Sequence, residues 1–302
     1  MNTRTVYSLV TLSALFWGAN FVLAKPVLAD LSPWWAAAAR FVLGALLMLG
    51  LALWRREDLA GPARRHAPVY LVMGALGIAA FNLLFFSALQ HTSAVNAALI
   101  MATNPLLTTV LAMLLLRERA GARQLASIPI ALVGVFIVIS GGSLQQLTAI
   151  HDLRGDLLML GADLAWAIYN VLGRRYLPRT SAITNTTLVM LAGAVLLALV
   201  ALGSGSAPPL PGVKALSALA LMVVGGTVLA YLFWNTGIAH LGAGRTALFL
   251  NLVPVFAMLA GITGGVLPTS PQLIGGALVI GGISLSMLPR RNPPLQATEA
   301  TK

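Results

Sequence analysis

The 302-residue chain contains no cysteine, so disulfide bonds, thiolate metal sites and cysteine nucleophiles are excluded. Charged residues are also scarce, at 9% of the chain, whereas 58% of the residues are hydrophobic. Both values lie far outside the usual range of soluble domains. The sequence shows no cluster of histidines and acids at metal-ligand spacing and no nucleophile beside a base, so we expect neither a metal, a cofactor nor an enzyme.

Long apolar runs dominate the chain instead. A helix needs about 20 mostly apolar residues to cross a bilayer. The predicted fold class is therefore an all-α integral membrane protein with ten transmembrane helices, and the loops are too short to hide a soluble domain. The predicted spans are 5–29, 34–53, 68–90, 93–116, 124–141, 155–173, 182–203, 215–238, 243–265 and 270–289, and the longest loops are 54–67, 142–154 and 204–214.

The formal net charge of +11 comes mostly from arginines between the predicted spans. If ten helices alternate in direction, most of these arginines lie on one side of the membrane, and the positive-inside rule then places both termini in the cytoplasm. Arginines that determine topology give no reason to expect a nucleic-acid partner. The residues concerned are Arg4, Arg55, Arg56, Arg64, Arg65, Arg117, Arg119, Arg123, Arg174, Arg175, Arg179, Arg290 and Arg291.

Two halves of the chain resemble each other when one is shifted by 149 residues. Residues 1–148 and 149–291 then form two units of five spans each, and 292–302 is predicted to be a disordered tail. Because five is odd, the second unit is inverted relative to the first, which places a substrate site near the midplane between them. Superimposed pairs include Trp17 with Trp166, Ser32 with Ser181, Gly44 with Gly193, His91 with His240 and Pro105 with Pro254.

Pro105 and Pro254 lie near the middle of the fourth and ninth predicted spans. A proline within a helix removes one backbone hydrogen bond and kinks the helix. Exposed backbone at that depth is tolerated only against protein or a watery cavity. A purely structural kink is one interpretation; we favour a cavity lining, because the pair is symmetric and Asn104 and Asn251 accompany it.

Trp17 and Trp166 lie about ten residues into their spans, roughly 15 Å deep, although tryptophan usually occupies the membrane interface. Core packing explains any one such residue. Together with several intramembrane asparagines they predict a cavity with aromatic walls and neutral polar patches, which suits a small amphipathic solute. Further members of this set are Asn20, Asn82, Asn96, Tyr169, Asn170, Tyr231, Trp234 and Asn235.

Lys25, Arg40 and Asp163 are charged residues inside predicted spans, all in the outer part of the membrane. Unpaired charges at such depth cost about 2.5–3.5 kcal/mol, so they should pair or meet water. Two structural interpretations stay open: Lys25 snorkels to the interface, or Arg40 pairs with Asp163. Coupling or gating is the functional interpretation, favoured for Asp163, the only acid deep in a span, which can meet a substrate ammonium or carry a coupling proton.

Helical geometry separates Lys25 from its neighbours in the first span. Trp17 and Asn20 are three residues apart and share one face, whereas Lys25 lies about 140° further round than Asn20. We therefore predict that Trp17 and Asn20 face the substrate and that Lys25 stands at the outer rim of the cavity, where it attracts a carboxylate.

The stretches FWGANFVLAKP, TNPLLTTVLAMLLLRER and QLASIPIALVGVFIVIS, with Arg40 in the second span, resemble the EamA-type drug/metabolite transporters. Within that superfamily the chain is similar to the YddG-type bacterial amino-acid exporters. The resemblance covers nearly the whole chain as two EamA repeats. It implies a ten-helix carrier in the bacterial inner membrane, which moves small metabolites by alternating access without an obligatory protein partner.

The resemblance also implies which spans line the central cavity, namely the first, third and fourth of each repeat. Here these spans carry Trp17, Asn20, Asn82, Asn104, Trp166, Tyr231 and Asn251. The sequence departs from the family pattern at one loop acid: Glu118 follows the fourth helix, but its counterpart near Val266 and Leu267 is absent. A symmetric pair of loop acids is therefore not expected.

Export of amino acids or related amphipathic metabolites is the function that these features favour. A proton-coupled multidrug antiporter is the first alternative, although position 14 is Ala14 instead of the glutamate that the small four-helix antiporters use, so Asp163 would have to replace it. A sugar-phosphate or nucleotide-sugar carrier is the second, and would need more basic residues in its centre than Lys25 and Arg40. A receptor is disfavoured by the inverted duplication, and a membrane enzyme by the lack of a catalytic or metal-ligand cluster in the sequence.

Overall fold

The computed structural model describes the chain except for residues 90, 92–99, 141–152, 206–209, 266 and 288–302, and its regular elements in the described part are all helical. Eight helices are long and apolar enough to cross a membrane. The chain is thus a multi-pass membrane protein. The eight are Thr3–Asp30, Pro33–Trp54, Ala60–Ala88, Ala122–Ser140, Ala182–Gly203, Val213–Leu241, Ala243–Gly261 and Ser270–Met287.

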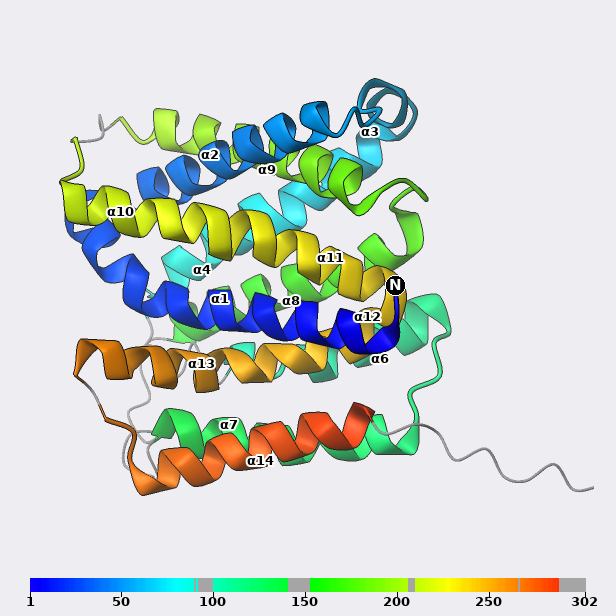
Figure 1. The fold of residues 1–302 in the computed structure, drawn as a ribbon, viewed down its shortest axis with the longest axis vertical. Coiled ribbons are helices and arrows are strands. Elements are labelled where there is room, and N and C mark those ends of the chain that lie inside the picture. The colour runs from blue at the N-terminus through cyan, green and yellow to red at the C-terminus, as the bar shows by residue number, and fades with distance from the viewer. Residues whose placement is uncertain (90, 92–99, 141–152, 206–209, 266, 288–302) are drawn as a thin grey trace, which may run out of the picture.

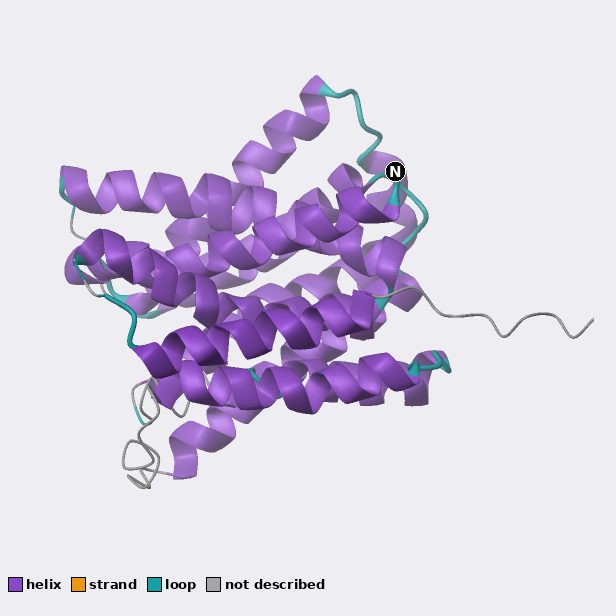
Figure 2. Ribbon diagram, turned by 60° about the horizontal axis from the view of Figure 1, so that its bottom comes forward, coloured by secondary structure: helices purple, strands orange, loops and turns teal. Residues whose placement is uncertain are grey.

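The helices run side by side, and the described loops lie at the two ends of the bundle (Figures 1 and 2). In chain order the elements are α1 (Thr3–Asp30), α2 (Pro33–Trp54), α3 (Ala60–Gly74), η1 (Ala75–Ala80), α4 (Phe81–Leu89), α6 (Asn104–Leu116), α7 (Ala122–Ser140), α8 (Leu153–Tyr176), α9 (Ala182–Gly203), α10 (Val213–Leu221), η3 (Met222–Leu229), α11 (Ala230–Leu241), α12 (Ala243–Ala247), η4 (Leu248–Asn251), α13 (Leu252–Gly261), η5 (Ile262–Gly264) and α14 (Ser270–Met287).

Two of the ten predicted spans are not among the eight. The span predicted at 155–173 corresponds to α8, whose 24 residues extend about 36 Å and are long enough to cross, although its charged residues make it less apolar. The span predicted at 93–116 is described only in part, as the 13-residue helix α6. A total of ten transmembrane helices therefore stays a prediction, as do the boundary at 148/149 and the tail 292–302, which lie outside the described residues.

The prediction that 54–67 is a loop was wrong, because α3 begins at Ala60. Asp58 Oδ1 accepts a hydrogen bond of 2.9 Å from the backbone N–H of Gly61 and so satisfies the first turn of the helix. The helix is broken at His66 (φ −127°, ψ 23°), two residues before Pro68. The arginines of this turn made it too polar to be recognised as part of a span.

The two halves of the chain interlock. Helix α1 packs on α11 and α13 of the second half, and α8 packs on α4 and α6 of the first half. Helix α2 packs on α9, and α7 packs on α14 at one edge of the bundle (Figure 1). The first helix of each half thus contacts the third and fourth helices of the other, which agrees with two inverted units.

A π-helix interrupts the third helix of each half, η1 in the first and η3 in the second, at places that the 149-residue shift superimposes. Gly77 and Gly226 lie at equivalent positions within them. A Cβ on Gly77 would lie 2.1 Å from the ring of Tyr169, and a Cβ on Gly226 would lie 2.3 Å from the side chain of Asn20. Tyr169 and Asn20 are themselves an equivalent pair, so each first helix approaches the other half's π-helix at a glycine.

Three loops that together carry five arginines lie at the same end of the bundle as the N-terminus (Figure 1). We call this end, with loops 55–59, 117–121 and 177–181, the arginine-rich end. The positive-inside rule predicts that it faces the cytoplasm.

Candidate functional site

Five aromatic side chains meet in the middle of the bundle; we call Trp17, Trp166, Tyr169, Tyr231 and Trp234 the central aromatic cluster. The ring centroid of Trp17 lies 5.5 Å from that of Trp166, 5.9 Å from Tyr231 and 5.0 Å from Trp234. Trp166 stacks on Tyr169 at 5.1 Å. The structure therefore brings together Trp17, Trp166 and Tyr231, which the sequence nominated separately, and their role in substrate binding stays a prediction.

The π-helices supply backbone acceptors to this cluster. Trp17 Nε1 donates to the carbonyl of Gly226 at 3.0 Å, and Tyr231 Oη donates to the carbonyl of Gly77 at 3.3 Å. A π-turn departs from the regular pattern of helical hydrogen bonds and is frequent at functional sites. Each π-helix thus holds one aromatic side chain of the cluster. Apart from the paired glycines, no sequence signal indicates these π-turns.

Some buried polar atoms beside the cluster have no hydrogen-bond partner within the described part of the chain. They are the Oδ1 atom of Asn20, the Nε1 atom of Trp166 and the Nδ2 atom of Asn170. Asn170 Oδ1 is paired, since it accepts from Trp234 Nε1 at 2.8 Å. Buried polar groups are costly unless they are paired. One acceptor and two donors are thus able to bind the polar part of a solute, next to aromatic faces that suit its apolar part.

The other predicted asparagines have different surroundings. Asn82 is buried and donates to the carbonyl of Ile78 in its own chain segment at 2.7 Å. Asn251 is 1% exposed, and neither its Oδ1 nor its Nδ2 atom has a partner among the described residues. Asn251 ends the 3₁₀ turn η4, directly before α13, so it marks the point where that span changes from 3₁₀ to α-helical geometry.

Asp163 is fully buried and is bound by two residues at the start of α6. Its Oδ1 atom accepts a hydrogen bond from Asn104 Nδ2 at 2.7 Å, and its Oδ2 atom accepts one from Thr103 Oγ1 at 3.1 Å. Asn104 Nδ2 also donates to the backbone carbonyl of Asp163 at 3.0 Å. The carboxylate therefore ties α8 of the second half to the interrupted fourth span of the first.

Arg40 does not pair with Asp163, so that structural interpretation was wrong. Its Nε atom donates to Thr227 Oγ1 at 2.7 Å, and its Nη2 atom donates to the carbonyl of Gly226 at 2.9 Å. The same carbonyl accepts from Trp17, so Arg40 is bound to η3 at the edge of the central aromatic cluster. Because both acceptors are neutral, these hydrogen bonds do not balance the positive charge of Arg40, which can therefore attract a nearby anion.

Pro105 does not lie within a continuous helix, as the sequence predicted, whereas Pro254 does lie inside the helical stretch Ala243–Gly261. Pro105 occupies the first turn of α6, after a break at Ala102 and Thr103. Pro254 is the third residue of α13, after the 3₁₀ turn η4. Proline is favourable in a first turn because no intrahelical partner is needed there for its missing N–H. The helix is thus interrupted just before Pro105, whereas before Pro254 it changes to 3₁₀ geometry without a break.

Alanine at either proline should slow transport several-fold without preventing folding. The substitution restores a backbone N–H, which lets α6 extend towards the break before it, or lets α-helical geometry extend from α13 into η4, and stiffens the span. Initial uptake rates of Pro105→Ala, Pro254→Ala and the double variant in proteoliposomes test this. Pro129→Ala in α7, at an exposed position, is the control. Normal rates in all three test variants would reduce these prolines to packing features.

Two pockets flank the central aromatic cluster. The helical stretch Val213–Leu241 passes all three places in turn. Leu219 and Met222 line the first pocket, Tyr231 and Trp234 belong to the cluster, and Leu241 lines the second pocket. The first pocket, with a volume of about 20 Å³, is also lined by Arg40 and Asn82. Lys25 is exposed and does not line this pocket, although its neighbour Ala24 does.

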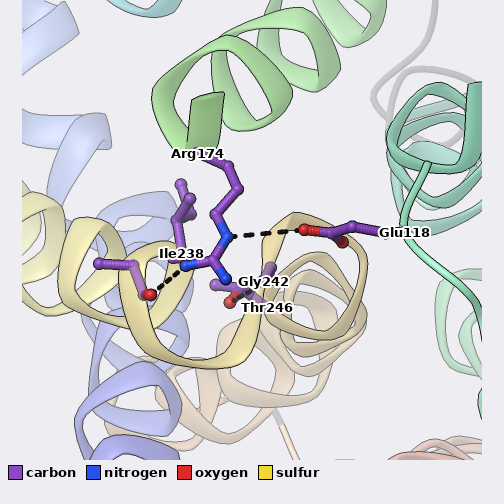
Figure 3. A network of polar contacts seen from close by, with 6 residues as sticks. Glu118, Arg174, Ile238, Gly242 and Thr246 are labelled. Atoms are coloured by element: carbon purple, nitrogen blue, oxygen red, sulfur yellow. Dashed lines mark hydrogen bonds and ion pairs between the residues drawn. The ribbon is translucent and has the colours of Figure 1, made fainter. Parts of the chain in front are cut away.

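The second pocket, of about 240 Å³, lies at the arginine-rich end between the two halves of the chain. Arg174 lies in its wall, 3.5 Å from Glu118 through Nε and Oε1 (Figure 3). Arg174 Nη1 also donates to the carbonyl of Ala239 at the end of α11. Sequence alone did not reveal this pocket, because Arg174 was interpreted as a topology determinant. The available signal was Glu118, a loop acid with no counterpart in the second half.

The sequence profile of the EamA-like transporter family matches the chain twice, over residues 4–140 and 153–288. This protein belongs to the EamA-like transporter family. Its described helices, its two interlocked halves and its resemblance to drug/metabolite transporters all agree with that membership. Members of the family are transporters and not enzymes, so the sequence prediction on both points is confirmed.

Relatives of this EamA protein carry transporter names. The "Uncharacterized transporter YyaM" of Bacillus subtilis is 38% identical over 94% of this chain and 93% of its own. The "Probable amino-acid metabolite efflux pump" of Salmonella typhimurium is 27% identical over 92% of this chain and 93% of its own. A solved crystal structure shares the fold, with a TM-score of 0.81 at 21% identity, over 94% of this chain and 97% of that one.

Proposed function

We propose that this EamA transporter exports amino acids or related small amphipathic metabolites across the bacterial inner membrane by alternating access. The observation that carries the proposal is the central aromatic cluster with its unpaired polar atoms, placed between two pockets where the halves of the chain interlock. On this proposal ten helices cross the membrane, and the arginine-rich end and both termini face the cytoplasm.

The chemistry of the cluster supports an amphipathic substrate. Three tryptophans and two tyrosines offer apolar faces with polar edges. Asn20, Trp166 and Asn170 offer an acceptor and two donors. Arg40 is the one guanidinium placed at the edge of this cluster in the described structure, so it is suited to a single carboxylate. The name of the Salmonella relative points to the same class of compound.

The other carrier types are less well supported. A sugar phosphate carries more negative charge than Arg40 alone would balance, and phosphate recognition usually employs several arginines or lysines. A multidrug antiporter needs a membrane-embedded acid, for which Asp163 is the candidate. Its two oxygens already accept hydrogen bonds from Thr103 and Asn104, which favours a role in gating or proton coupling over direct capture of a large cation.

An uptake panel in proteoliposomes tests the proposed function. Amino acids, cationic dyes and sugar phosphates are each offered with and without a proton gradient. Saturable transport confined to amino acids is the expected result. Dye transport that requires the gradient would instead identify an antiporter, and transport of sugar phosphates alone would also refute the proposal.

Asp163→Asn should abolish stimulation of transport by a pH gradient while leaving passive exchange intact. An asparagine has nearly the same shape and can still accept from Asn104 Nδ2, so α8 and α6 should stay packed, but it cannot carry a proton. The measurement is exchange and gradient-driven uptake in the same vesicles. Asp58→Asn, at the start of α3, is the control. Unchanged dependence on the gradient in Asp163→Asn would remove this carboxylate from coupling.

A further inference from the structure

The pocket at the arginine-rich end contains an unusual combination of charges. Arg119, Arg174 and Arg245 line it together with one acid, Glu118. Met113 and Leu241 add apolar surface to the same wall. The volume of about 240 Å³ exceeds the space of a few water molecules and accommodates a small organic solute.

Only part of this charge is paired within the described structure. Arg174 contacts Glu118 at 3.5 Å, and their side chains are 38% and 32% exposed. Half-exposed ion pairs contribute little stability, so this contact is easily exchanged. The side chains of Arg119 and Arg245 form no hydrogen bond or ion pair with any described residue. Two guanidinium groups are therefore ready for an anion, next to a carboxylate that is only weakly held.

The arrangement matches a zwitterion better than a simple anion. Arg245, Arg119 and Glu118 line one pocket, so a solute that binds its carboxylate to the arginines has a carboxylate in the same pocket for its ammonium group. The solute would then form two ion pairs while the loose contact between Glu118 and Arg174 opens. A solute with only the carboxylate would gain the first interaction and face repulsion from Glu118.

The position of the pocket connects binding there with movement of the two halves. Its walls come from α6, α7 and loop 117–121 of the first half and from α8, α11 and α12 of the second. Gly242 joins α11 to α12 with φ +89°, a conformation that favours glycine, and a Cβ there would lie 3.2 Å from the carboxylate of Glu118 (Figure 3). A movement of the Glu118 side chain therefore directly affects the turn at Gly242, between the third and fourth helices of the second half.

We propose that this pocket is a capture site for zwitterionic solutes, in which Arg245 and Arg119 bind the carboxylate and Glu118 binds the ammonium group. The inference rests on the proposed function, since it names the charge pattern of the exported compound and the place where it is first bound. Release of Arg174 from Glu118 by the solute frees the turn at Gly242 and the interface between the halves.

A cysteine probe tests the site directly, because the chain has no cysteine of its own. Ala120 lines the pocket, so Ala120→Cys places a thiol there with little change in volume. The rate of its reaction with a water-soluble maleimide is measured in nanodiscs of phosphatidylcholine, alone and with increasing fractions of phosphatidylglycerol. Aliphatic, hydroxylated and aromatic amino acids are each compared with the amine and the carboxylic acid of the same carbon skeleton. We expect the zwitterions to slow labelling several-fold and the matched single ions to slow it much less.

Further substitutions, each combined with Ala120→Cys, test the role of each side chain in the pocket. Glu118→Gln should reduce protection by an amino acid to that of the matched acid, and Arg245→Gln should remove protection by both. Arg175→Gln is the matched control, because Arg175 donates to the carbonyl of Leu115 and does not line the pocket; protection should persist there. Labelling without solute shows that the pocket stays accessible in each variant.

Three outcomes would overturn the capture site: no zwitterion protects, the matched acid protects equally well, or labelling follows the fraction of anionic phospholipid in the nanodisc and ignores amino acids. The last outcome would assign the arginines to lipid headgroups. Measuring transport alongside protection of the introduced cysteine distinguishes the capture site from the proposed export function. Amino-acid transport without protection refutes the capture site alone, whereas protection without transport upholds the site and refutes export.

Discussion

Replacing Trp17 with alanine should lower transport of every substrate by at least about tenfold. The substitution removes ring contacts with Trp166, Tyr231 and Trp234 and the hydrogen bond to the carbonyl of Gly226. Aromatic pairs contribute about 0.5–1.5 kcal/mol each beyond their buried area, and about 1.4 kcal/mol corresponds to a tenfold change in affinity. Uptake by wild-type and variant proteoliposomes, normalised to the amount of folded protein, is the measurement.

Two further variants separate the roles of the ring and its N–H group. Trp17→Phe keeps an aromatic ring without the donor and should give an intermediate rate. Phe21→Ala is the control on the same helix, because Phe21 is 53% exposed and should be dispensable. A cysteine at position 17 should react with a small water-soluble maleimide and be protected by substrate. Normal transport by Trp17→Ala, or an unreactive cysteine in an active carrier, would place the substrate site elsewhere.

Alanine at Gly77 should prevent normal folding or strongly destabilise the protein. The new Cβ would lie 2.1 Å from the ring of Tyr169. That ring cannot move aside, since it is fully buried, stacks on Trp166 and donates from Oη to Asn235 Oδ1 at 2.7 Å. Overpacking of this kind costs about 1–3 kcal/mol or more. Thermal unfolding of the purified protein should show a clearly lower midpoint, and transport should be lost with it.

Other glycines supply a graded comparison for this prediction. Gly226→Ala should be less severe, because the atoms that it meets belong to the side chain of Asn20, whose Oδ1 atom is unpaired and which can rotate. Gly161→Ala should be nearly neutral, since its nearest neighbour, a methyl of Leu84, lies 3.5 Å away. Wild-type stability of Gly77→Ala would mean that α8 and η1 do not approach each other as closely as described.

Much of the architecture could be predicted without the structure. The apolar runs specified the membrane class and the limits of most helices, because the length needed to cross a bilayer is a local property of the chain. The internal repetition predicted two related halves, and the EamA motifs identified the family that the comparisons confirm. The intramembrane positions of Trp17, Trp166 and Tyr231 also predicted that they line a cavity, and the structure brings all three into one cluster.

The partners of these residues were decided only by the tertiary structure. Arg40 binds η3 and not Asp163, and Asp163 binds Asn104, because the first helix of each half packs against the opposite half. Composition and spacing determine which residues enter the membrane and how deep they lie. Tertiary contacts decide which backbones come close enough to share a carbonyl, turn into a π-helix or enclose a charged pocket. These contacts join residues far apart in the chain, and no local pattern contains them.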